Sequence, residues 1–447
     1  MKPNSTTKLT WREKICYGFG DCGANFTATL ATTFLTGFYT DTVGISAAAV
    51  GTMLMFGRIF DGITDLFMGA VVDRTKSKYG KARPWLLWTA PFMSLALILM
   101  FNVPSSLGAS GKLIYAYLTY IFQGCFVYTA NNLPYNALLA RMTLDVQERA
   151  SASSLRFVMA QITGLLTNIA TSTLLGTLGW FWLSIIYAVL TFVLLILSFL
   201  GVKEHIGSSK EEETDIVPLK TAIPAVLKNK YFYLQSLMFL SLYIHIVSIA
   251  SMSYYFCSSV LQNVAMVSLV STAGTIPAIV VNLVLPNFVK KFGKRRLMIV
   301  GSVLMILGNL IVGAAGTNIT LIFAGILIKG FGQGPIMSCI FAMTADVVDY
   351  GEWKTGIRSE GLVNSCTSFG MKIGVGVGSV VCTSILSAGG YLGTAATQTD
   401  AAINMIRFGF GYNGAILSAI LLILIIFTNI DKDIVNIQKE LELRHAQ

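Results

Sequence analysis

Three charged side chains, Arg58, Asp61 and Asp65, fall within the otherwise apolar stretch 53–72. Asp61 and Asp65 are four residues apart, so a helix would project both carboxylates from one face, with Arg58 one turn earlier on the same side. A charged side chain near the centre of a bilayer costs about 2.5–3.5 kcal/mol on insertion scales. We therefore expect the two acids to have a function that offsets this cost. We therefore predict a site for a small cation, a proton or sodium, and Asp61 and Asp65 are metal ligands if the cation is sodium.

Two further sets of polar residues recur every four positions within apolar segments, which places each set along one face of a helix. The sets are Tyr17, Asp21 and Asn25, and Tyr128, Asn132 and Asn136, the latter with Pro134 interrupting the backbone hydrogen bonds. An amide offers both donors and an acceptor, so an asparagine-lined helix suits sugar hydroxyl groups. Hydrogen bonding between helices is the alternative, above all for Asn25. We predict that the second set, together with Asp21 and Asn25, binds substrate.

Basic residues inside the apolar segments are candidates for the countercharge. Arg156 opens one segment, and Lys372 lies in the middle of another. Lys372 and Arg58 are predicted to balance the acid pair, and Lys372 and Arg156 are predicted to contact the substrate; snorkelling to the bilayer surface is the alternative for Lys372. The role of Lys329 stays open, and His245 is expected to be a packing residue.

Two glycine-rich runs lie in the second half of the chain. Glycines 370, 374, 376 and 378 surround Lys372, and no strand precedes them, so close approach of helices explains them better than a dinucleotide-binding loop. The run GFGQGP at 330–335 predicts a flexible break in its helix that could act as a gating bend.

The composition is that of a polytopic membrane protein. Of 447 residues, 54% are hydrophobic and only 12% are charged, whereas about a quarter of a typical soluble protein is charged. The net charge of +10 is explained by cationic loops at an anionic membrane surface, so no nucleic-acid partner is expected. The seven cysteines lack metal-like spacing, and no signal peptide is expected. No zinc signature, nucleophile elbow or phosphate loop predicts an enzyme or a cofactor.

Twelve apolar segments are long enough to cross a bilayer, which takes about 20 residues. They are 13–40, 46–72, 84–103, 112–140, 151–177, 181–202, 230–258, 264–289, 297–315, 319–345, 360–388 and 402–429. This predicts an all-α fold of twelve transmembrane helices. Its parts are an N-terminal six-helix half at 1–202, a cytoplasmic linker at 203–229, a C-terminal six-helix half at 230–429 and a cytoplasmic tail at 430–447.

Alternate loops are rich in Lys and Arg, above all 74–83 and 290–296, while the loops between them carry almost none. By the positive-inside rule both termini face the cytoplasm, and a bacterial inner membrane is the expected location. The two basic loops resemble each other, SKYGKAR at 77–83 and KKFGKRR at 290–296, and each follows the second segment of its half. Two six-helix halves around a central linker are the organisation of major facilitator superfamily transporters, whose substrate site lies near the midplane.

Several motifs make the chain resemble the glycoside–pentoside–hexuronide:cation symporters, which include the melibiose carrier and the glucuronide permease, over nearly its full length. They are YGFGD at 17–21, RIFDGITD at 58–65, SKYGKARPW at 77–85, NLPYNAL at 132–138 and ADVVDYGEWKTGIRSEG at 345–361. The resemblance implies that Asp61, Asp65, Thr64 and Thr129 form the cation site. It also implies that basic residues lie near the binding sites at Arg156 and Lys372.

At two positions the chain has asparagines where the melibiose carrier has other residues. Asn25 and Asn132 stand where that carrier has aspartates that hold galactoside hydroxyls, and Ala24 replaces a neighbouring lysine. The glucuronide permease is similar to this chain at both asparagines. Loss of two acids, with Arg156 and Lys372 kept, favours an anionic sugar. A glucuronide or another hexuronide or pentoside is therefore the predicted substrate.

Charged residues at the cytoplasmic ends of helices are predicted to gate the carrier by latching its halves together. They are Asp73, Arg74 and Arg83 in the first half, and Asp346, Asp349, Glu352 and Arg358 in the second. The predicted function is symport of a glycoside with a proton or sodium ion by alternating access, by a protein expected to be monomeric. A lysolipid or other organic-anion symporter on the same fold is the alternative. A sugar sensor would carry an extra cytoplasmic domain, for which the linker is too short.

Overall fold

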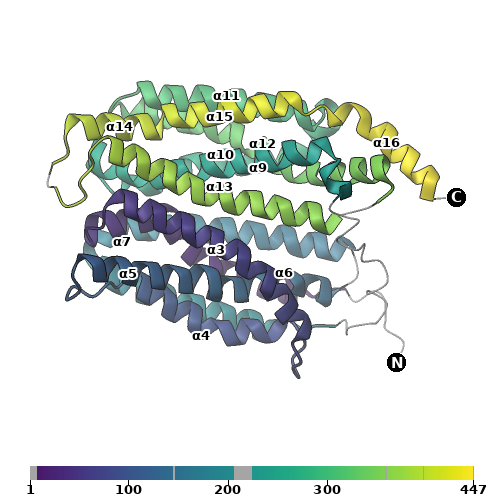
Figure 1. The fold of residues 1–447 in the computed structure, drawn as a ribbon, viewed down its shortest axis with the longest axis horizontal. Coiled ribbons are helices and arrows are strands. Elements are labelled where there is room, and N and C mark those ends of the chain that lie inside the picture. The colour runs from purple at the N-terminus through teal and green to yellow at the C-terminus, as the bar shows by residue number, and fades with distance from the viewer. Residues whose placement is uncertain (1–7, 144–145, 206–223, 358–359, 396, 446–447) are drawn as a thin grey trace. The chain divides into compact units, whose positions relative to one another are not determined.

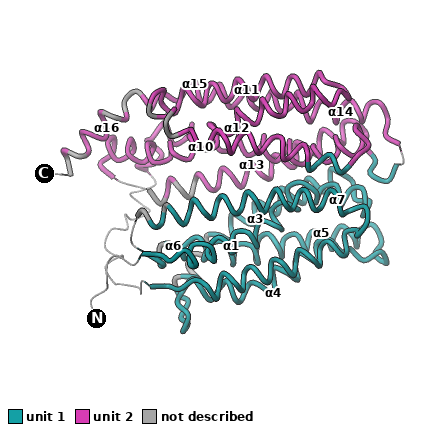
Figure 2. Tube along the Cα trace, turned by 180° about the vertical axis from the view of Figure 1, so that it is seen from behind, with its two compact units in different colours: residues 1–212, 264–268, 392–396 teal, residues 213–263, 269–391, 397–447 magenta. Residues whose placement is uncertain are grey.

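The computed structural model describes residues 8–143, 146–205, 224–357, 360–395 and 397–445. Every regular element within these ranges is a helix (Figure 1), which confirms the predicted all-α class. The chain divides into two compact units (Figure 2). Unit 1 comprises 1–212, 264–268 and 392–396, and unit 2 comprises 213–263, 269–391 and 397–447.

The helices of unit 1 are joined by π-helical segments, labelled η, at several places. In chain order the elements are α1 (Trp11–Thr29), η1 (Leu30–Phe34), α2 (Leu35–Gly37), η2 (Phe38–Thr42), α3 (Ala47–Arg74), α4 (Arg83–Met100), α5 (Ala109–Ile121), η3 (Phe122–Tyr128), α6 (Thr129–Met142) and α7 (Val146–Gly201). Because α5, η3 and α6 are continuous, they form one long helix with a widened turn in its middle. Such π-helical turns are frequent at functional sites.

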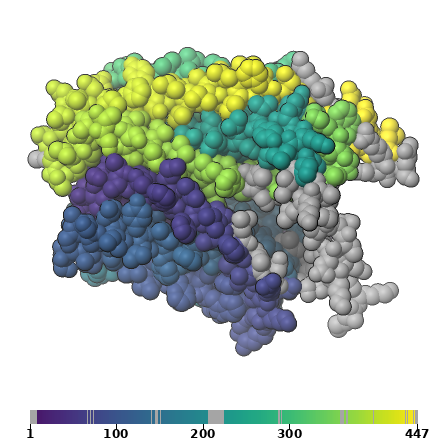
Figure 3. Space-filling view, in the orientation of Figure 1, coloured from purple at the N-terminus to yellow at the C-terminus, as the bar shows by residue number. Residues whose placement is uncertain are grey.

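Unit 2 repeats the pattern of long helices joined by short connections. Its elements, with the first residues of α10 counted in unit 1, are α9 (Lys230–Tyr255), η5 (Phe256–Val260), α10 (Met266–Phe292), α11 (Lys294–Ala314), α12 (Ile319–Thr355), α13 (Glu360–Ala388), α14 (Asp400–Phe410), α15 (Tyr412–Phe427) and α16 (Ile430–His445). In the space-filling view, α15 (yellow) lies along the surface of unit 2 (Figure 3). Ile416, Ile420, Ile423 and Phe427 are exposed on this helix, as a face against lipid requires.

Nine helices among the described residues are long and apolar enough to cross a membrane. One of them, within α7, has a non-helical residue at its middle, Gly179 with φ 69°, between the predicted spans 151–177 and 181–202. Helices α1 and α3 are not among the nine, and both carry charged residues that the sequence places in the site. These observations are consistent with twelve spans, and the predicted domain boundaries remain predictions.

Capping residues fix where the helices of unit 1 begin. The Thr10 hydroxyl accepts a hydrogen bond from the backbone N–H of Glu13 at 3.2 Å, and the Glu13 carboxylate accepts one from the backbone N–H of Thr10 at 2.9 Å. This reciprocal pair is a capping box for α1. The Glu204 carboxylate accepts hydrogen bonds from the backbone N–H groups of residues 81, 82 and 83, at 3.1, 2.8 and 2.7 Å. An anion in this position is favoured by the partial positive charge at the start of α4.

Glycines bring the helices of unit 2 into backbone contact. A Cβ on Gly332 of α12 would lie 2.3 Å from the carbonyl oxygen of Gly301 on α11. The run at 330–335 is therefore a packing surface, and α12 continues through it, so the predicted flexible break is wrong. The prediction for the run around Lys372 is confirmed, because a Cβ on Gly374 or Gly378 of α13 would lie within 3 Å of a carbonyl oxygen of α9.

Candidate functional site

The centre of the candidate site is Asp61 on α3, a carboxylate that is only 3% exposed. The Thr129 hydroxyl, at the start of α6, donates a hydrogen bond to Asp61 Oδ1 at 2.8 Å. Arg58 Nη1 lies 3.7 Å from Asp61 Oδ2, one turn earlier on α3. Three of the residues that the sequence places in or beside a cation site are thus in contact within unit 1.

The next turn of α3 carries the remaining residues of the predicted cation site. The Thr64 hydroxyl donates to the backbone carbonyl of Asp61 at 3.0 Å, which holds it against its own helix. Asp65 is half-buried. Among the described residues, no three side chains of His, Cys, Asp or Glu converge as in a multivalent metal centre. A set of carboxylate and hydroxyl oxygens instead suits a hard cation such as sodium, or a proton on a carboxylate.

A second constellation is centred on Arg156 of α7. Its Nε lies 3.4 Å from Asp21 Oδ2 on α1. Its Nη1 donates to the Tyr17 hydroxyl at 3.1 Å and to Asn136 Oδ1 at 2.8 Å. The guanidinium also lies over the Tyr135 ring, 5.3 Å from its centroid. Asp21 therefore compensates the positive charge of Arg156 in place.

A chain of hydrogen bonds runs from Arg156 along α6. Asn136 Nδ2 donates to Asn132 Oδ1 at 2.7 Å, and Asn132 Nδ2 donates to the Tyr128 hydroxyl at 3.4 Å. The predicted substrate residues on α6 therefore share one face and are linked to one another. Asn25 differs, because its Nδ2 donates to the backbone carbonyl of Asp21 at 3.0 Å, within its own helix.

A cavity whose empty space, its open mouth included, is about 490 Å³ adjoins both constellations. Arg58 and Tyr128, from the two groups above, line it together with Thr27, Met100, Tyr120 and Gln123. Gln123, Thr27 and Tyr120 are functional candidates that the sequence analysis did not single out. The one signal for Gln123 was a polar side chain within the predicted span 112–140.

The basic residues of the C-terminal half lie in unit 2. Lys372 on α13 is half-buried, and its pairing with the carboxylates of unit 1 remains a prediction. His245 on α9 is 2% exposed and has Asn309 Nδ2 at 3.3 Å from its Nε2, consistent with a packing role. Lys329 Nζ lies over the Phe410 ring, 5.4 Å from its centroid.

The predicted gating residues that have described partners make contacts within their own units. Asp346 pairs with Lys294 at 2.5 Å, and Asp349 accepts a hydrogen bond from Gln438 of α16 at 3.0 Å, both in unit 2. Arg83 Nε donates to the carbonyl of Phe199 at 2.9 Å in unit 1. A latch between the halves therefore remains a prediction.

Among the other predicted gating residues, Glu352 is buried and Arg74 is exposed. The Asp73 side chain and Arg358 lie outside the described residues.

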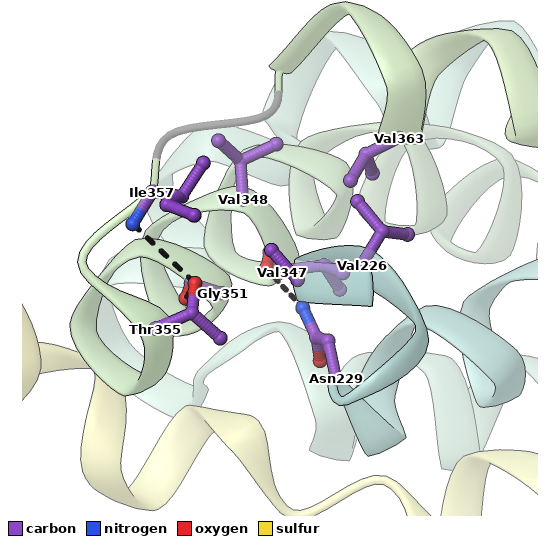
Figure 4. A pocket seen from close by; sticks show the side chains of 9 residues that line it. Val226, Asn229, Val347, Val348, Gly351, Thr355, Ile357 and Val363 are labelled. Carbon is purple, nitrogen blue, oxygen red and sulfur yellow. Dashed lines mark hydrogen bonds between the residues drawn. The ribbon is translucent and has the colours of Figure 1, made fainter. Parts of the chain in front are cut away.

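A second, smaller cavity near the end of α12 is mainly apolar (Figure 4). Its empty space, the open mouth included, is about 210 Å³, and its walls include Val226, Val347 and Val363. The amide of Asn229 on its wall is already engaged, since Nδ2 donates to the carbonyl of Val347 at 2.8 Å and Oδ1 accepts from the backbone N–H of Tyr231 at 3.0 Å. This cavity therefore offers a polar ligand little to bind.

The amino-acid sequence is similar to those of known sugar transporters. The chain is 31% identical over 450 residues to the isoprimeverose transporter of Lactiplantibacillus pentosus, covering 98% of this chain and 93% of the relative. It is 31% identical over 421 residues to the glucuronide carrier protein homolog of Escherichia coli K12, covering 90% and 88%. These sugar carriers do not favour the lysolipid alternative.

Solved structures agree on the fold. A bacterial homologue of the human lysosomal transporter Spinster, in an inward-facing and unoccupied conformation, has a TM-score of 0.68 with 12% identity and 96% coverage of both chains. The family model described as "MFS/sugar transport protein" matches residues 16–432. The chain is therefore a membrane transporter and not an enzyme, and it belongs to the MFS/sugar transport protein family.

Proposed function

We propose that this protein imports a glycoside, a glucuronide or another hexuronide or pentoside, together with a proton or a sodium ion. The observation that carries the proposal is the buried Asp61 carboxylate, which the Thr129 hydroxyl contacts at 2.8 Å and Arg58 at 3.7 Å. A buried carboxylate with a loosely placed countercharge is costly in an apolar environment. A cation that binds there removes part of that cost, and this gain is available to drive a conformational change.

The cation site consists of Asp61, Asp65, Thr64 and Thr129, with Arg58 holding the charge balance when the cation is absent. Lys372 supplies further positive charge from the C-terminal half. A cation neutralises one carboxylate and weakens the pull of Asp61 on Arg58. The substrate site is the chain of polar groups formed by Asp21, Arg156, Asn136, Asn132 and Tyr128, and Asn25 extends it on α1. Its amide groups can both donate to and accept from sugar hydroxyls.

The two sites work together by alternating access. Loaded or empty, the halves 1–202 and 230–429 rock around the central site, joined by the linker 203–229, with the tail 430–447 in the cytoplasm. The residues predicted to gate form and break their contacts during this motion. In this proposal the protein lies in a bacterial inner membrane with both termini in the cytoplasm, which the basic loops support. The carrier works as a monomer, with the lipid bilayer, the cation and the glycoside as its partners.

The test is Asp61→Asn in proteoliposomes with an imposed sodium or proton gradient. We expect uphill accumulation of glycoside to disappear while sugar exchange persists, because the amide keeps the shape of the carboxylate but cannot take up a proton and offers no negative charge to a sodium ion. Asp400→Asn is the control, since Asp400 is an exposed acid at the start of α14. Undiminished accumulation by Asp61→Asn would remove this carboxylate from the coupling step.

A further inference from the structure

The cavity in unit 1 extends beyond the chain of polar groups assigned to the substrate above and shares only Tyr128 with it. It is bounded by the end of α1, by α3 and by the π-helical segment η3, all within unit 1.

Buried polar groups on its wall lack hydrogen-bond partners among the described residues. Gln123 is 2% exposed, and neither its Nε2 nor its Oε1 has a partner in the part of the chain that the structure describes. Within the same ranges, the Oγ1 of Thr27, a residue that is 4% exposed, and the Nε of Arg58 are also without one. Each unpaired buried polar group costs about 1–3 kcal/mol, so an amide with both ends unpaired is a strong sign that a ligand completes it.

The chemistry of the walls selects the occupant. A bare cation is disfavoured, because the Arg58 guanidinium is part of the wall. A wholly apolar ligand would leave the Gln123 amide unpaired. A sugar ring fits, since each hydroxyl both donates and accepts, as the amide and the Thr27 hydroxyl also do. The side chains of Tyr120, Tyr128 and Met100 supply the apolar surface for the ring faces.

We propose that this cavity is a second sugar subsite, which receives the second ring of a two-ring glycoside, and that Gln123 and Thr27 select for it. The proposal rests on the proposed function. Tyr128 connects the two subsites, because it lines the cavity while its hydroxyl accepts a hydrogen bond from Asn132. The first ring lies along Asn132 and Asn136, and the second occupies the space between Gln123 and Thr27.

The experiment compares binding of two-ring and one-ring ligands by the full-length protein in nanodiscs, measured by calorimetry with saturating sodium at a pH of about 6. The first pair of probes is isoprimeverose, a disaccharide, and methyl α-D-xylopyranoside. The second pair is phenolphthalein glucuronide, whose second ring is aromatic, and methyl β-D-glucuronide. A subsite built on Gln123 should distinguish a hydroxyl-bearing ring from an aromatic one.

We expect Gln123→Leu to weaken binding of isoprimeverose about tenfold, the equivalent of one to two hydrogen bonds, and to change binding of the one-ring probes less than twofold. Thr27→Val should also weaken binding of isoprimeverose, by about threefold. Because valine has the shape of threonine, this variant tests the subsite even if Gln123→Leu does not fold. Gln235→Leu is the matched control, because Gln235 is a buried glutamine of unit 2 whose Nε2 donates to the carbonyl of Ile340. It should leave the ratio of the two affinities unchanged.

Equal losses for one-ring and two-ring probes would show a structural role for Gln123 and would overturn the subsite. Unchanged binding of isoprimeverose by both variants, with a gain in thermal stability, would show that the cavity holds only water and would overturn it too. Wild-type protein that binds none of the four probes would overturn the subsite and the proposed function together. If the wild type binds the probes but the variants do not lose more affinity for isoprimeverose than for the one-ring probes, the subsite is wrong and the proposed function stands.

Discussion

Asp61 has one close and one more distant partner, and this difference determines how its carboxylate can bind a cation. The Thr129 hydroxyl is at 2.8 Å, the distance of a strong hydrogen bond to a charged acceptor, whereas the Arg58 nitrogen is at 3.7 Å, beyond hydrogen-bond range. Arg58 therefore balances charge without saturating the carboxylate. An arriving cation can share the carboxylate with Thr129 and displace the weaker partner. The hydroxyl then becomes a ligand to the cation through its oxygen.

Thr129→Val tests this role, because valine keeps the shape and removes the oxygen. Sodium would lose one of its oxygen ligands, so we expect the apparent affinity for sodium to fall about tenfold, the equivalent of about 1.4 kcal/mol. Sugar affinity at saturating cation should be unchanged. Cation dependence of glycoside binding in nanodiscs measures both quantities.

The control for that measurement is Thr119→Val. Thr119 is 7% exposed on α5, and its hydroxyl donates to the backbone carbonyl of Tyr115 at 2.9 Å. It shares the burial of Thr129, but its hydroxyl is bound to the backbone and not to a carboxylate. Loss of cation affinity in both variants would point to damage of the helix and not to a lost ligand.

At the scale of the helices, what the sequence could predict depends on whether the partner lies on the same helix. Regular helical spacing was enough to place Asn132 beside Asn136 and Arg58 beside Asp61, since each pair shares one helix. The contact of Thr129 with Asp61 joins two helices, and it followed from the family resemblance and not from spacing. The apolar spans could be anticipated because bilayer thickness fixes helix length.

Gln123 was missed for a physical reason. It lies in η3, where the wider π-helical turn breaks the regular helical spacing. The cavity that it faces also depends on Gly57, where a Cβ would lie 2.3 Å from the Tyr120 ring. Contacts of this kind between helices leave no periodic trace in the sequence. The prediction of a flexible break at 330–335 was wrong for the same reason, because the residues that pack against its glycines belong to α10 and α11.

Gly332→Ala tests whether this run serves packing. The new methyl group would meet the Gly301 carbonyl oxygen at 2.3 Å and a backbone nitrogen of Met305 at 2.9 Å, so α11 and α12 must move apart. Overpacking of this kind costs about 1–3 kcal/mol. We expect a lower midpoint of thermal unfolding in detergent.

Gly176→Ala is the matched control, because a methyl group added to this residue of α7 would have no described atom of another part of the chain within 4 Å. Alanine there should be neutral or stabilising by up to about 1 kcal/mol, from its higher helix propensity. Equal stability of Gly332→Ala and the wild type would show that contact between α11 and α12 does not explain the glycines of α12.

At the scale of the whole molecule, the membrane voltage acts on the net charge that crosses in each cycle. One elementary charge moving through 100 mV is worth about 2.3 kcal/mol, and each factor of ten in concentration costs about 1.4 kcal/mol. A carrier that moves one cation with one neutral sugar can therefore reach roughly 50-fold accumulation from voltage alone. With an anionic sugar the charges cancel, and only the chemical gradient of the cation drives uptake.

This arithmetic gives a prediction about substrate and stoichiometry together. In proteoliposomes with 100 mV imposed, negative inside, and equal cation on both sides, a neutral pentoside should accumulate up to roughly 50-fold and a glucuronide should not accumulate. An imposed cation gradient without voltage should drive accumulation of both the pentoside and the glucuronide. This measurement is the control that the protein is active. Voltage-driven accumulation of the glucuronide would contradict coupling to one cation. It would instead require both Asp61 and Asp65 to be loaded in every cycle, because a second positive charge must then cross with each sugar.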